Sequence, residues 1–217
     1  MGSTNDNVRR DSARQGEEFI ALVREKMSRL VQEFANGEIN RTQFHRLYDR
    51  YQRQIAAVTQ LLAESDPALW RAAVNDGEDT QHLKKRLSAR PIGMAVYLAG
   101  ADQPVQTFGV FDIAPSRIQP MLESYGRAVG DAFRAGMRRT ELDDGRWLCF
   151  VPGARTTLVA LFSLEPTDSQ LATLERLHHD FEQANRYALE QSAPDPQALA
   201  YPYYTFVQRR GEALDQG

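Results

Sequence analysis

The fold is decided by residues 91–111, PIGMAVYLAGADQPVQTFGVF. Within this stretch, Ile92–Leu98 is a nearly continuous apolar run, which is typical of a strand buried on both faces of a sheet. Gly100–Pro104 carries the residues of a turn, and Val105–Phe111 is expected to return as the partner strand of a hairpin. The stretch therefore predicts two antiparallel strands inside a larger sheet.

Helix and strand signals continue after this hairpin. Ser116, with Gln119 three residues later, predicts a capping box at the start of a long helix that runs to Ala135. Beyond that helix, the turn signal Asp143-Asp144-Gly145-Arg146 favours a hairpin. Three further strands are predicted around and after this turn, at residues 138–142, 147–151 and 156–164.

The last helix of this region begins with a second capping box, formed by Thr167 and Gln170, and extends to about Gln191. The order of elements over residues 91–191 is therefore ββαβββα. Short turns between strands favour antiparallel pairing, so we expect an α+β fold with a five-stranded antiparallel sheet and packed helices. The inward-facing stripe of the last helix is predicted to be Leu171, Leu174, Leu177, Phe181, Ala184 and Ala188.

Two amphipathic stripes precede the sheet region. Residues 1–16 are polar, and we expect them to form a disordered tail. Residues 17–64 are predicted to form an antiparallel helical hairpin, because two apolar stripes are joined by a short link. Gly37 in that link suits the left-handed position after a helix, and Asn40 with Gln43 predicts a capping box on the second helix.

Two segments flank the sheet region. Residues 65–90 are interpreted as a helical connector, with a short helix through Trp70 and another capped by Thr80, and Arg90-Pro91 marks the expected domain boundary. Residues 192–217 form a proline-rich and aromatic tail. Its aromatic cluster is expected to lie in a groove or on a sheet edge, since so much apolar surface is seldom left in water. The alternative is a detachable tail that a partner regulates.

Composition limits the class of protein. The chain has 217 residues, a net charge of −3 and a pI near 5.9, and this balance disfavours a general nucleic-acid binder. The single cysteine, Cys149, lies in an apolar run, which indicates a buried thiol in a reducing compartment. No apolar run is long enough for a membrane span, and the first 16 residues lack the apolar region of a signal peptide. We therefore expect a cytoplasmic protein.

No pattern of residues predicts chemistry. The adjacent histidines His178 and His179 diverge by about 100° around a helix, so a solvated pair is favoured over a metal site. Phosphate-binding glycine motifs and a serine nucleophile motif are absent from the sequence. The sequence thus predicts no catalytic residue, no cofactor, no metal ligand and no enzymatic activity.

Two clusters are candidate interaction surfaces. The first combines small residues and cations around the long helix and the third strand, and the small residues would allow close approach of a neighbour. For its cations, stabilisation of a helix C-terminus is the alternative role. This predicted interface comprises Tyr125, Gly126, Gly130, Arg134, Arg138 and Arg139. A secondary candidate is the outer face of the second hairpin helix, with Arg46, Arg50 and Arg53, for which a simple solvated face is the alternative.

The ββαβββα order from Ile92 to Leu189 resembles the roadblock and longin superfamily within the profilin-like group. Ile92-Gly93-Met94-Ala95-Val96-Tyr97 occupies the position of the first strand of that family, and Gly100-Ala101-Asp102 represents its first turn. The resemblance implies a non-catalytic module that forms homodimers through its central helix and a sheet edge. It also implies a small Ras-like GTPase, or another signalling protein, as the partner. The extra helical hairpin would add dimer or partner surface.

A ligand-sensing domain of the PAS or GAF kind is the alternative function. Such a domain needs a pocket between the sheet and the central helix, and an internal cavity of about 300 Å³ or more would favour it. Large side chains expected in that space argue instead for a packed core: Tyr125, Phe133, Trp147 and Phe162.

Overall fold

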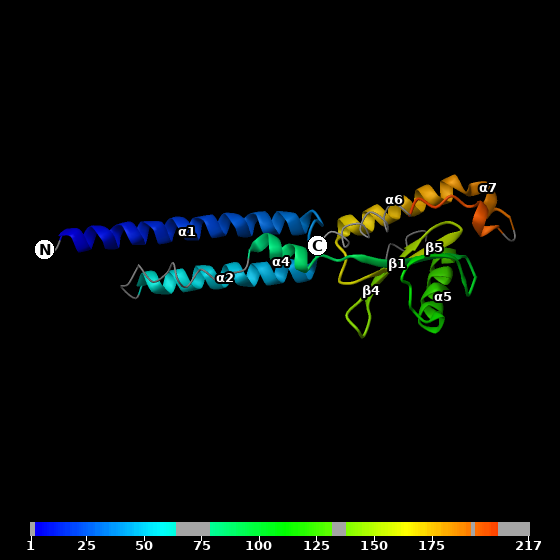
Figure 1. Cartoon of the computed structure of the whole chain (residues 1–217), viewed down its shortest axis with the longest axis horizontal. Helices are drawn as coiled ribbons and strands as arrows, with labels where there is room; N and C mark the ends of the chain where they lie inside the picture. The colour runs from blue at the N-terminus through cyan, green and yellow to red at the C-terminus, as the bar shows by residue number, and fades with distance from the viewer. Residues whose placement is uncertain (1–2, 64–78, 132–137, 192–193, 204–217) are drawn as a thin grey trace. The chain divides into compact units, whose positions relative to one another are not determined.

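The structure is a computed structural model, and it describes residues 3–63, 79–131, 138–191 and 194–203 (Figure 1). The chain divides into two compact units, Met1–Ser88 and Ala89–Gly217. We call them unit 1 and unit 2 and describe each by itself. Among the described residues, no helix combines the length and the apolar character needed to cross a membrane.

Unit 1 is built on two long helices that lie side by side, α1 (Ser3–Ala35) and α2 (Arg41–Ala63) (Figure 1). They form the predicted helical hairpin. The start of α1 differs from the expectation of a disordered tail over residues 1–16, because the helix already begins at Ser3. Arg14 forms ion pairs with Asp11 and Glu18 along this segment, and Gly16 packs closely against Leu62. These contacts support a helix whose sequence lacks an apolar stripe.

The start of α2 confirms the predicted capping box. The Asn40 side chain accepts a hydrogen bond from the Gln43 N–H, and the Gln43 side chain accepts one from the Asn40 N–H, both at 2.8 Å. Gly37, in the link before it, has a φ of 69°. Both amide groups then use their remaining N–H donors on a third helix: Asn40 Nδ2 donates to the Leu87 carbonyl at 3.1 Å, and Gln43 Nε2 to the Lys84 carbonyl at 2.7 Å.

That third helix, α4 (Thr80–Arg86), packs on one side of the hairpin. Its N-cap is Asp79, so the prediction that Thr80 caps this helix is wrong by one residue. Leu83 is buried in the core of unit 1, and Lys84 forms an ion pair with Glu33 of α1. The predicted helix through Trp70 lies outside the described residues. The core of unit 1 consists of Val23, Leu30, Ile39, Leu47, Tyr51 and Leu83.

Unit 2 contains the predicted five-stranded antiparallel sheet, with the order β2-β1-β5-β4-β3. The hairpin quoted at the outset forms its first two strands, with Met94 opposite Phe108. The inner strands read as continuous apolar runs because both of their faces are covered. The strands are β1 (Pro91–Leu98), β2 (Pro104–Gly109), β3 (Arg138–Glu141), β4 (Trp147–Pro152) and β5 (Thr156–Phe162).

Helices cover the two faces of the sheet. Helix α5 (Pro115–Asp131) lies on one face, while α6 (Asp168–Ala184) and the short α7 (Arg186–Leu189) lie on the other (Figure 1). Side chains alternate between the faces: Ala95, Leu148 and Phe150 pack with Ile118 of α5. On the opposite face, a larger cluster packs against Leu174 and Phe181 of α6. Its strand residues include Met94, Val96, Phe108, Cys149, Leu158 and Phe162.

Two expectations about α5 need correction. The helix begins at Pro115, so Ser116 lies inside it and is not the N-cap; the Gln119 amide donates instead to Asp102 at 2.9 Å. In addition, Trp147 and Phe162 pack on the α6 face of the sheet, so they do not fill the space beside the central helix. Strand alternation decides this, since each inner strand sends successive side chains to opposite faces.

The start of α6 repeats the arrangement seen at α2. Thr167 and Gln170 form the predicted capping box. The Gln170 side chain also donates from Nε2 to the carbonyl of Ala89, 81 positions earlier in the chain, at 3.0 Å. In both units, therefore, a residue that starts a helix also binds a distant backbone carbonyl.

Candidate functional site

The C-terminal segment of the described chain packs against α6 of unit 2. A short 3-10 helix, η1 (Pro196–Ala198), leads into Leu199–Tyr203, which we call the strap. Leu199 and Tyr203 are buried, whereas Ala200 between them is exposed. The strap therefore completes the larger core cluster of the domain, so the start of the predicted aromatic cluster is packed against the fold, while residues 204–206 of that cluster lie outside the described residues.

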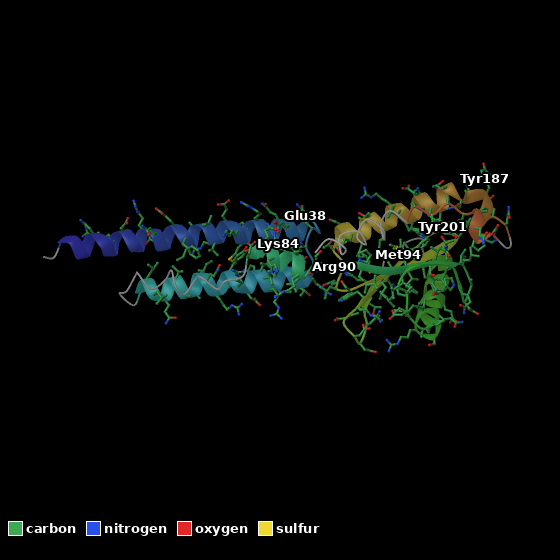
Figure 2. All side chains as sticks on the ribbon, viewed as in Figure 1. Glu38, Lys84, Arg90, Met94, Tyr187 and Tyr201 are labelled. Carbon is green, nitrogen blue, oxygen red and sulfur yellow. The ribbon has the colours of Figure 1, made fainter. Side chains whose placement is uncertain are left out.

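Aromatic rings line the surface under the strap. The Tyr203 ring centroid lies 5.6 Å from that of Phe108 on β2 and 5.5 Å from that of Phe181 on α6. Tyr201, which is labelled in Figure 2, packs against the same two rings, with centroids 5.3 Å and 5.5 Å away. Such spacings fall in the range of favourable ring pairs. We call this surface, made by Phe108, Phe181 and their neighbours on α6, the strap groove.

Polar contacts with Asn185 and His178 fix the position of the strap on the helical face. The Asn185 side chain donates to the Ala200 carbonyl at 2.8 Å and accepts from the Ala200 N–H at 2.7 Å. The Tyr203 hydroxyl lies 2.8 Å from Nδ1 of the buried His178. His178 Nε2 faces the Thr156 carbonyl at 3.3 Å. Because a carbonyl only accepts, Nε2 carries the proton in the neutral ring, and Nδ1 accepts a hydrogen bond from the Tyr203 hydroxyl.

One turn beyond His178, the Glu182 carboxylate organises the loop between β4 and β5. It accepts hydrogen bonds from the N–H groups of Ala154, Arg155 and Thr156 at 2.8–2.9 Å. The Thr156 hydroxyl adds a fourth bond at 2.7 Å. A Cβ atom at Gly153 would overlap this carboxylate, so a larger residue there would force the Glu182 side chain to shift from its hydrogen bonds. We call this arrangement the Glu182 cradle.

Burial and hydrogen bonding displace the pKa values of these groups. Burial lowers the pKa of His178, against the opposing effects of the Glu182 charge and the Thr156 backbone. Burial raises the pKa of Glu182, but the hydrogen bonds of the cradle outweigh it, so the net pKa lies below its ordinary value. Burial raises the pKa of Tyr203 as well, which keeps the phenol protonated as a donor. The folded state therefore holds a neutral imidazole beside a charged carboxylate.

This arrangement predicts loss of stability in mild acid. His178 is protonated less readily in the folded than in the unfolded chain, so its contribution is present above the ordinary pKa of 6.5 and is lost as pH falls below it. Glu182 contributes above its ordinary pKa of 4.5 and loses that contribution at lower pH. We therefore expect the free energy of unfolding to fall as pH is lowered from about 7.5 to 5, and the loss in this window to come from His178.

Urea denaturation across this pH range measures the effect. A His178→Gln variant should lose most of the slope, whereas His179→Gln, at the exposed neighbouring position, should retain it. A slope that disappears in the His179 variant instead would contradict the assignment to His178.

A second candidate surface lies on the hairpin of unit 1. Helix α4 covers one side, where it meets Leu30 and Glu33 of α1. The next positions around α1, Val31 and Phe34, lie on the other side and are 47% and 37% exposed. Phe34 stacks on Phe44 with centroids 4.7 Å apart, and Phe44 stacks on Tyr48 at 5.4 Å. We call Val31, Phe34, Phe44 and Tyr48 the hairpin patch.

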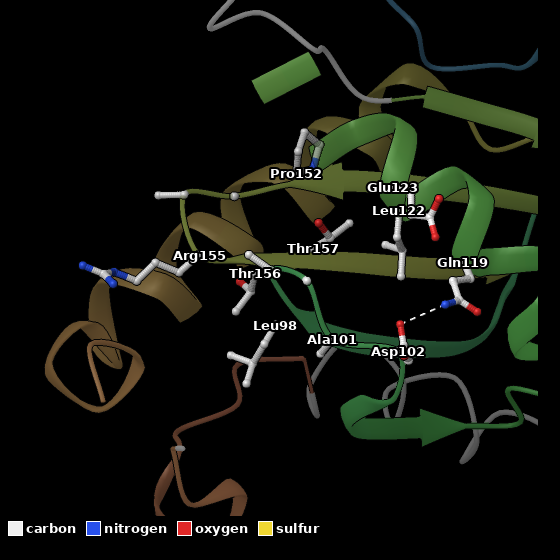
Figure 3. A pocket seen from close by; sticks show the side chains of 14 residues that line it. Leu98, Ala101, Asp102, Gln119, Leu122, Glu123, Pro152, Arg155, Thr156 and Thr157 are labelled. Atoms are coloured by element: carbon white, nitrogen blue, oxygen red, sulfur yellow. Dashed lines mark hydrogen bonds between the residues drawn. The ribbon is translucent and has the colours of Figure 1, made fainter. Parts of the chain in front are cut away.

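A third feature is an open pocket of about 220 Å³ at the end of the sheet, beside α5. It is lined by the turn after β1, by the loop after β4 and by Gln119, Leu122 and Glu123 of α5. Figure 3 shows the Asp102–Gln119 hydrogen bond at its wall, and the Arg155 side chain directed away from that bond. Arg155 instead pairs with Glu190 at 3.3 Å.

The interface predicted from sequence is only partly described. Gly126 and Gly130, like Tyr125, lie in the second half of α5, where side chains are outside the described residues; Arg134 lies outside them altogether. Arg138 and Arg139 occupy the edge strand β3. Arg138 pairs with Phe150 and Arg139 with Cys149, so the two point to opposite faces and do not form one cationic surface.

Arg139 has a local role at the start of α6. Its guanidinium lies 2.9 Å from Asp168 and 3.6 Å from the buried Glu165, and it donates to the Pro166 carbonyl at 3.4 Å. These contacts brace the edge strand against the helix. In the secondary candidate surface on α2, Arg46 and Arg53 are exposed and Arg50 is half-buried.

The buried thiol predicted at Cys149 is confirmed, and burial raises its pKa to about 12. It therefore carries no thiolate near neutral pH. Within the part of the chain that the structure describes, no group of three or more histidine, cysteine, aspartate or glutamate side chains is arranged to hold a metal ion.

Sequence reasoning missed the residues that hold the strap. The sequence pattern predicts a solvated His178, yet His178 is buried, as is Asn185, while the predicted stripe member Ala184 is exposed. The buried positions of α6 and its continuation are spaced by three and four residues: Leu171, Leu174, His178, Phe181, Asn185 and Leu189. That spacing was the available signal, since the stripe passes through two polar residues.

Comparison with known proteins gives no assignment: no family model matches the chain, and neither a curated protein nor a solved structure is significantly similar to it.

Proposed function

We propose that the chain is a non-catalytic protein-interaction module that acts as a regulator and forms a homodimer. The observation that carries this proposal is the hairpin patch. Helix α4 covers one side of the hairpin, while Val31 and Phe34 remain exposed on the other beside the stacked rings of Phe44 and Tyr48. A second copy brings an identical patch, and two hairpins meeting through such patches form a four-helix arrangement.

Our finer proposal is that unit 2 is a roadblock/longin-like domain, and that the dimer regulates or scaffolds a small Ras-like GTPase in the cytoplasm. Its support is the observed order of five strands and two long helices, which is the order on which the resemblance rests. The edge strand β3 leaves its outer side unpaired with any described strand. Fold analogy supports this partner class by association only, so it needs a binding experiment.

The geometry of unit 2 supports a non-catalytic role without a cofactor. Three groups with displaced pKa values are all engaged inside the fold: His178 and Tyr203 bind each other, and His178 and Glu182 bind Thr156 at the end of the β4–β5 loop. Their hydrogen-bonding capacity is directed into the fold. Perturbed pKa values also occur in structural networks, and the contacts here fit that class.

Light scattering coupled to size-exclusion chromatography tests the dimer. The chain should elute as a dimer at tens of micromolar, and Val31→Glu/Phe34→Glu should weaken dimerisation about 100-fold or more, because two buried charges would face the partner. Ser28→Glu is a matched control at an exposed position of the same helix and should leave the dimer intact. A monomeric wild-type chain would refute the proposal.

The GTPase partner is tested separately. Immobilised chain should retain a small Ras-like GTPase from a defined panel of purified proteins, with different affinities for the GDP-bound and GTP-bound forms. Equal, non-saturable retention of all panel members would reject this partner class while leaving the dimer in place.

Ligand sensing is the second candidate, and the pocket beside Asp102 and Gln119 is the feature that bears on it. Its volume of about 220 Å³ lies below the range of about 300–1,000 Å³ that is usual for small-molecule sites. We therefore favour the interaction module.

A further inference from the structure

The strap is held in the way that a groove holds a bound peptide. Leu199, Tyr201 and Tyr203 belong to or pack against the core of unit 2, while Ala200 between the first two is exposed. The strap turns at Pro202 and Tyr203, and the side chains near its two ends, Leu199 and Tyr203, are buried, as side-chain pockets hold the anchors of a bound peptide. The strap makes no strand pairing with the sheet.

Two kinds of contact hold the strap: one binds its backbone, and the other binds a specific side chain. Asn185 binds both backbone groups of Ala200, so this contact reads main chain and is independent of the side chain there. Tyr203 supplies the specific contact: its ring is fully buried against Phe108 and Phe181, and its hydroxyl reaches His178 at the bottom of the groove. The groove thus selects a tyrosine three residues after the backbone anchor.

The same contacts define what the strap hides. Phe108 and Phe181 are buried in the presence of Tyr201 and Tyr203, which cover them as ring partners. His178 sits beneath, with its Nδ1 acceptor aimed at the strap. An unoccupied groove would expose apolar rings around one hydrogen-bond acceptor, which is a surface suited to a tyrosine side chain.

We propose that the strap groove is a peptide-binding site which the chain's own residues 199–203 occupy as an intramolecular ligand, and that the same segment of a second copy can replace them. The second copy is the chosen occupant because this segment demonstrably fits the groove, and every copy carries it. Exchange would join two copies through unit 2. This contact is separate from the hairpin patch of unit 1, so either can fail while the other holds.

The experiment uses the full chain with a protease site introduced at residues 192–193. After cleavage, a fluorescent peptide of residues 194–206 is titrated in, and binding is followed by anisotropy. The cleaved protein should bind the peptide at least about tenfold more tightly than the uncleaved protein, in which the tethered strap competes at high effective concentration. Carrying out the titration in the Val31→Glu/Phe34→Glu chain excludes any contribution of the hairpin patch.

Matched peptides test specificity. A Tyr203→Ala peptide should bind about 100-fold more weakly, because it loses a buried ring and a hydrogen bond. A Gln197→Ala peptide alters an exposed position and should bind like the parent. As a second readout, His178→Gln in the cleaved protein should weaken the parent peptide while leaving the already weak Tyr203→Ala peptide unchanged.

Three results would overturn the proposal. Equal binding of the parent and Tyr203→Ala peptides would show that the groove does not read this segment. Absence of peptide binding to a folded, cleaved protein would show that the groove is not a site. Loss of the near-ultraviolet circular dichroism signal on cleavage would show that unit 2 cannot stay folded without the tethered strap.

Discussion

Tyr203→Ala is expected to lower the free energy of unfolding of unit 2 by about 3–5 kcal/mol, the range for removing a large buried ring. Tyr203 is fully buried in the larger core cluster, and its ring packs against the rings of Phe108 and Phe181. Its removal also leaves Nδ1 of His178 without the hydroxyl that donates to it. Urea denaturation monitored by circular dichroism measures the change.

Two further variants separate the ring from the hydroxyl. Tyr203→Phe keeps the ring and should cost about 1–3 kcal/mol, since a buried acceptor is left unsatisfied. Tyr187→Ala is the control, because Tyr187 is 82% exposed and projects from α7 (Figure 2), and its replacement should change stability by less than about 0.5 kcal/mol. If Tyr203→Ala behaved like Tyr187→Ala, the strap would not belong to the cooperative core.

The second large effect is expected at the Glu182 cradle. Glu182→Ala removes an acceptor that binds three backbone N–H groups and the Thr156 hydroxyl, and should destabilise unit 2 by about 3–5 kcal/mol. Hydrogen bonds to a charged group are the stronger kind, and the loop donors would lose all of theirs at once. The same denaturation experiment measures it.

Gly153→Ala tests the same contact by adding a Cβ atom next to the Glu182 carboxylate. The added Cβ would overlap the carboxylate, and we expect a loss of about 2–3 kcal/mol. In the Glu182→Ala background this loss should shrink by about 1 kcal/mol or more, because the overlapping group is gone. Glu190→Gln disrupts exposed ion pairs with Arg155 and Arg186 and should cost less than about 1 kcal/mol. If the stability losses of Glu182→Ala and Gly153→Ala were strictly additive, a direct contact between these two positions would be contradicted.

The fold was largely predictable because its signals are local. The apolar runs of β1 and β5, the turn at 143–146 and the boxes at Asn40 and Thr167 each depend on residues a few positions apart. The failures also have local causes. Ser116 satisfies the capping pattern, yet Pro115 already starts that helix, since its fixed φ suits the first helical turn.

The strap groove was harder to predict because it joins distant segments. Phe108, Thr156, His178 and Tyr203 come from four elements, and only the fold brings them together. A polar residue within an apolar stripe, such as His178, indicates burial, but its partner cannot be read from spacing. The hairpin patch was predictable as apolar surface, whereas the side that α4 covers was decided by the non-local bonds of Gln43 and Asn40.

Those bonds have a practical consequence for dissecting the chain into fragments. The Asn40 and Gln43 amides need the carbonyls of Leu87 and Lys84, whereas Gln170 needs the carbonyl of Ala89. A cut between Ser88 and Ala89 keeps each of these three donors in the same fragment as its carbonyl acceptor. A cut at Arg90-Pro91, where composition alone suggests the boundary, would strip Ala89 from the downstream piece and leave a truncated product with an orphaned donor.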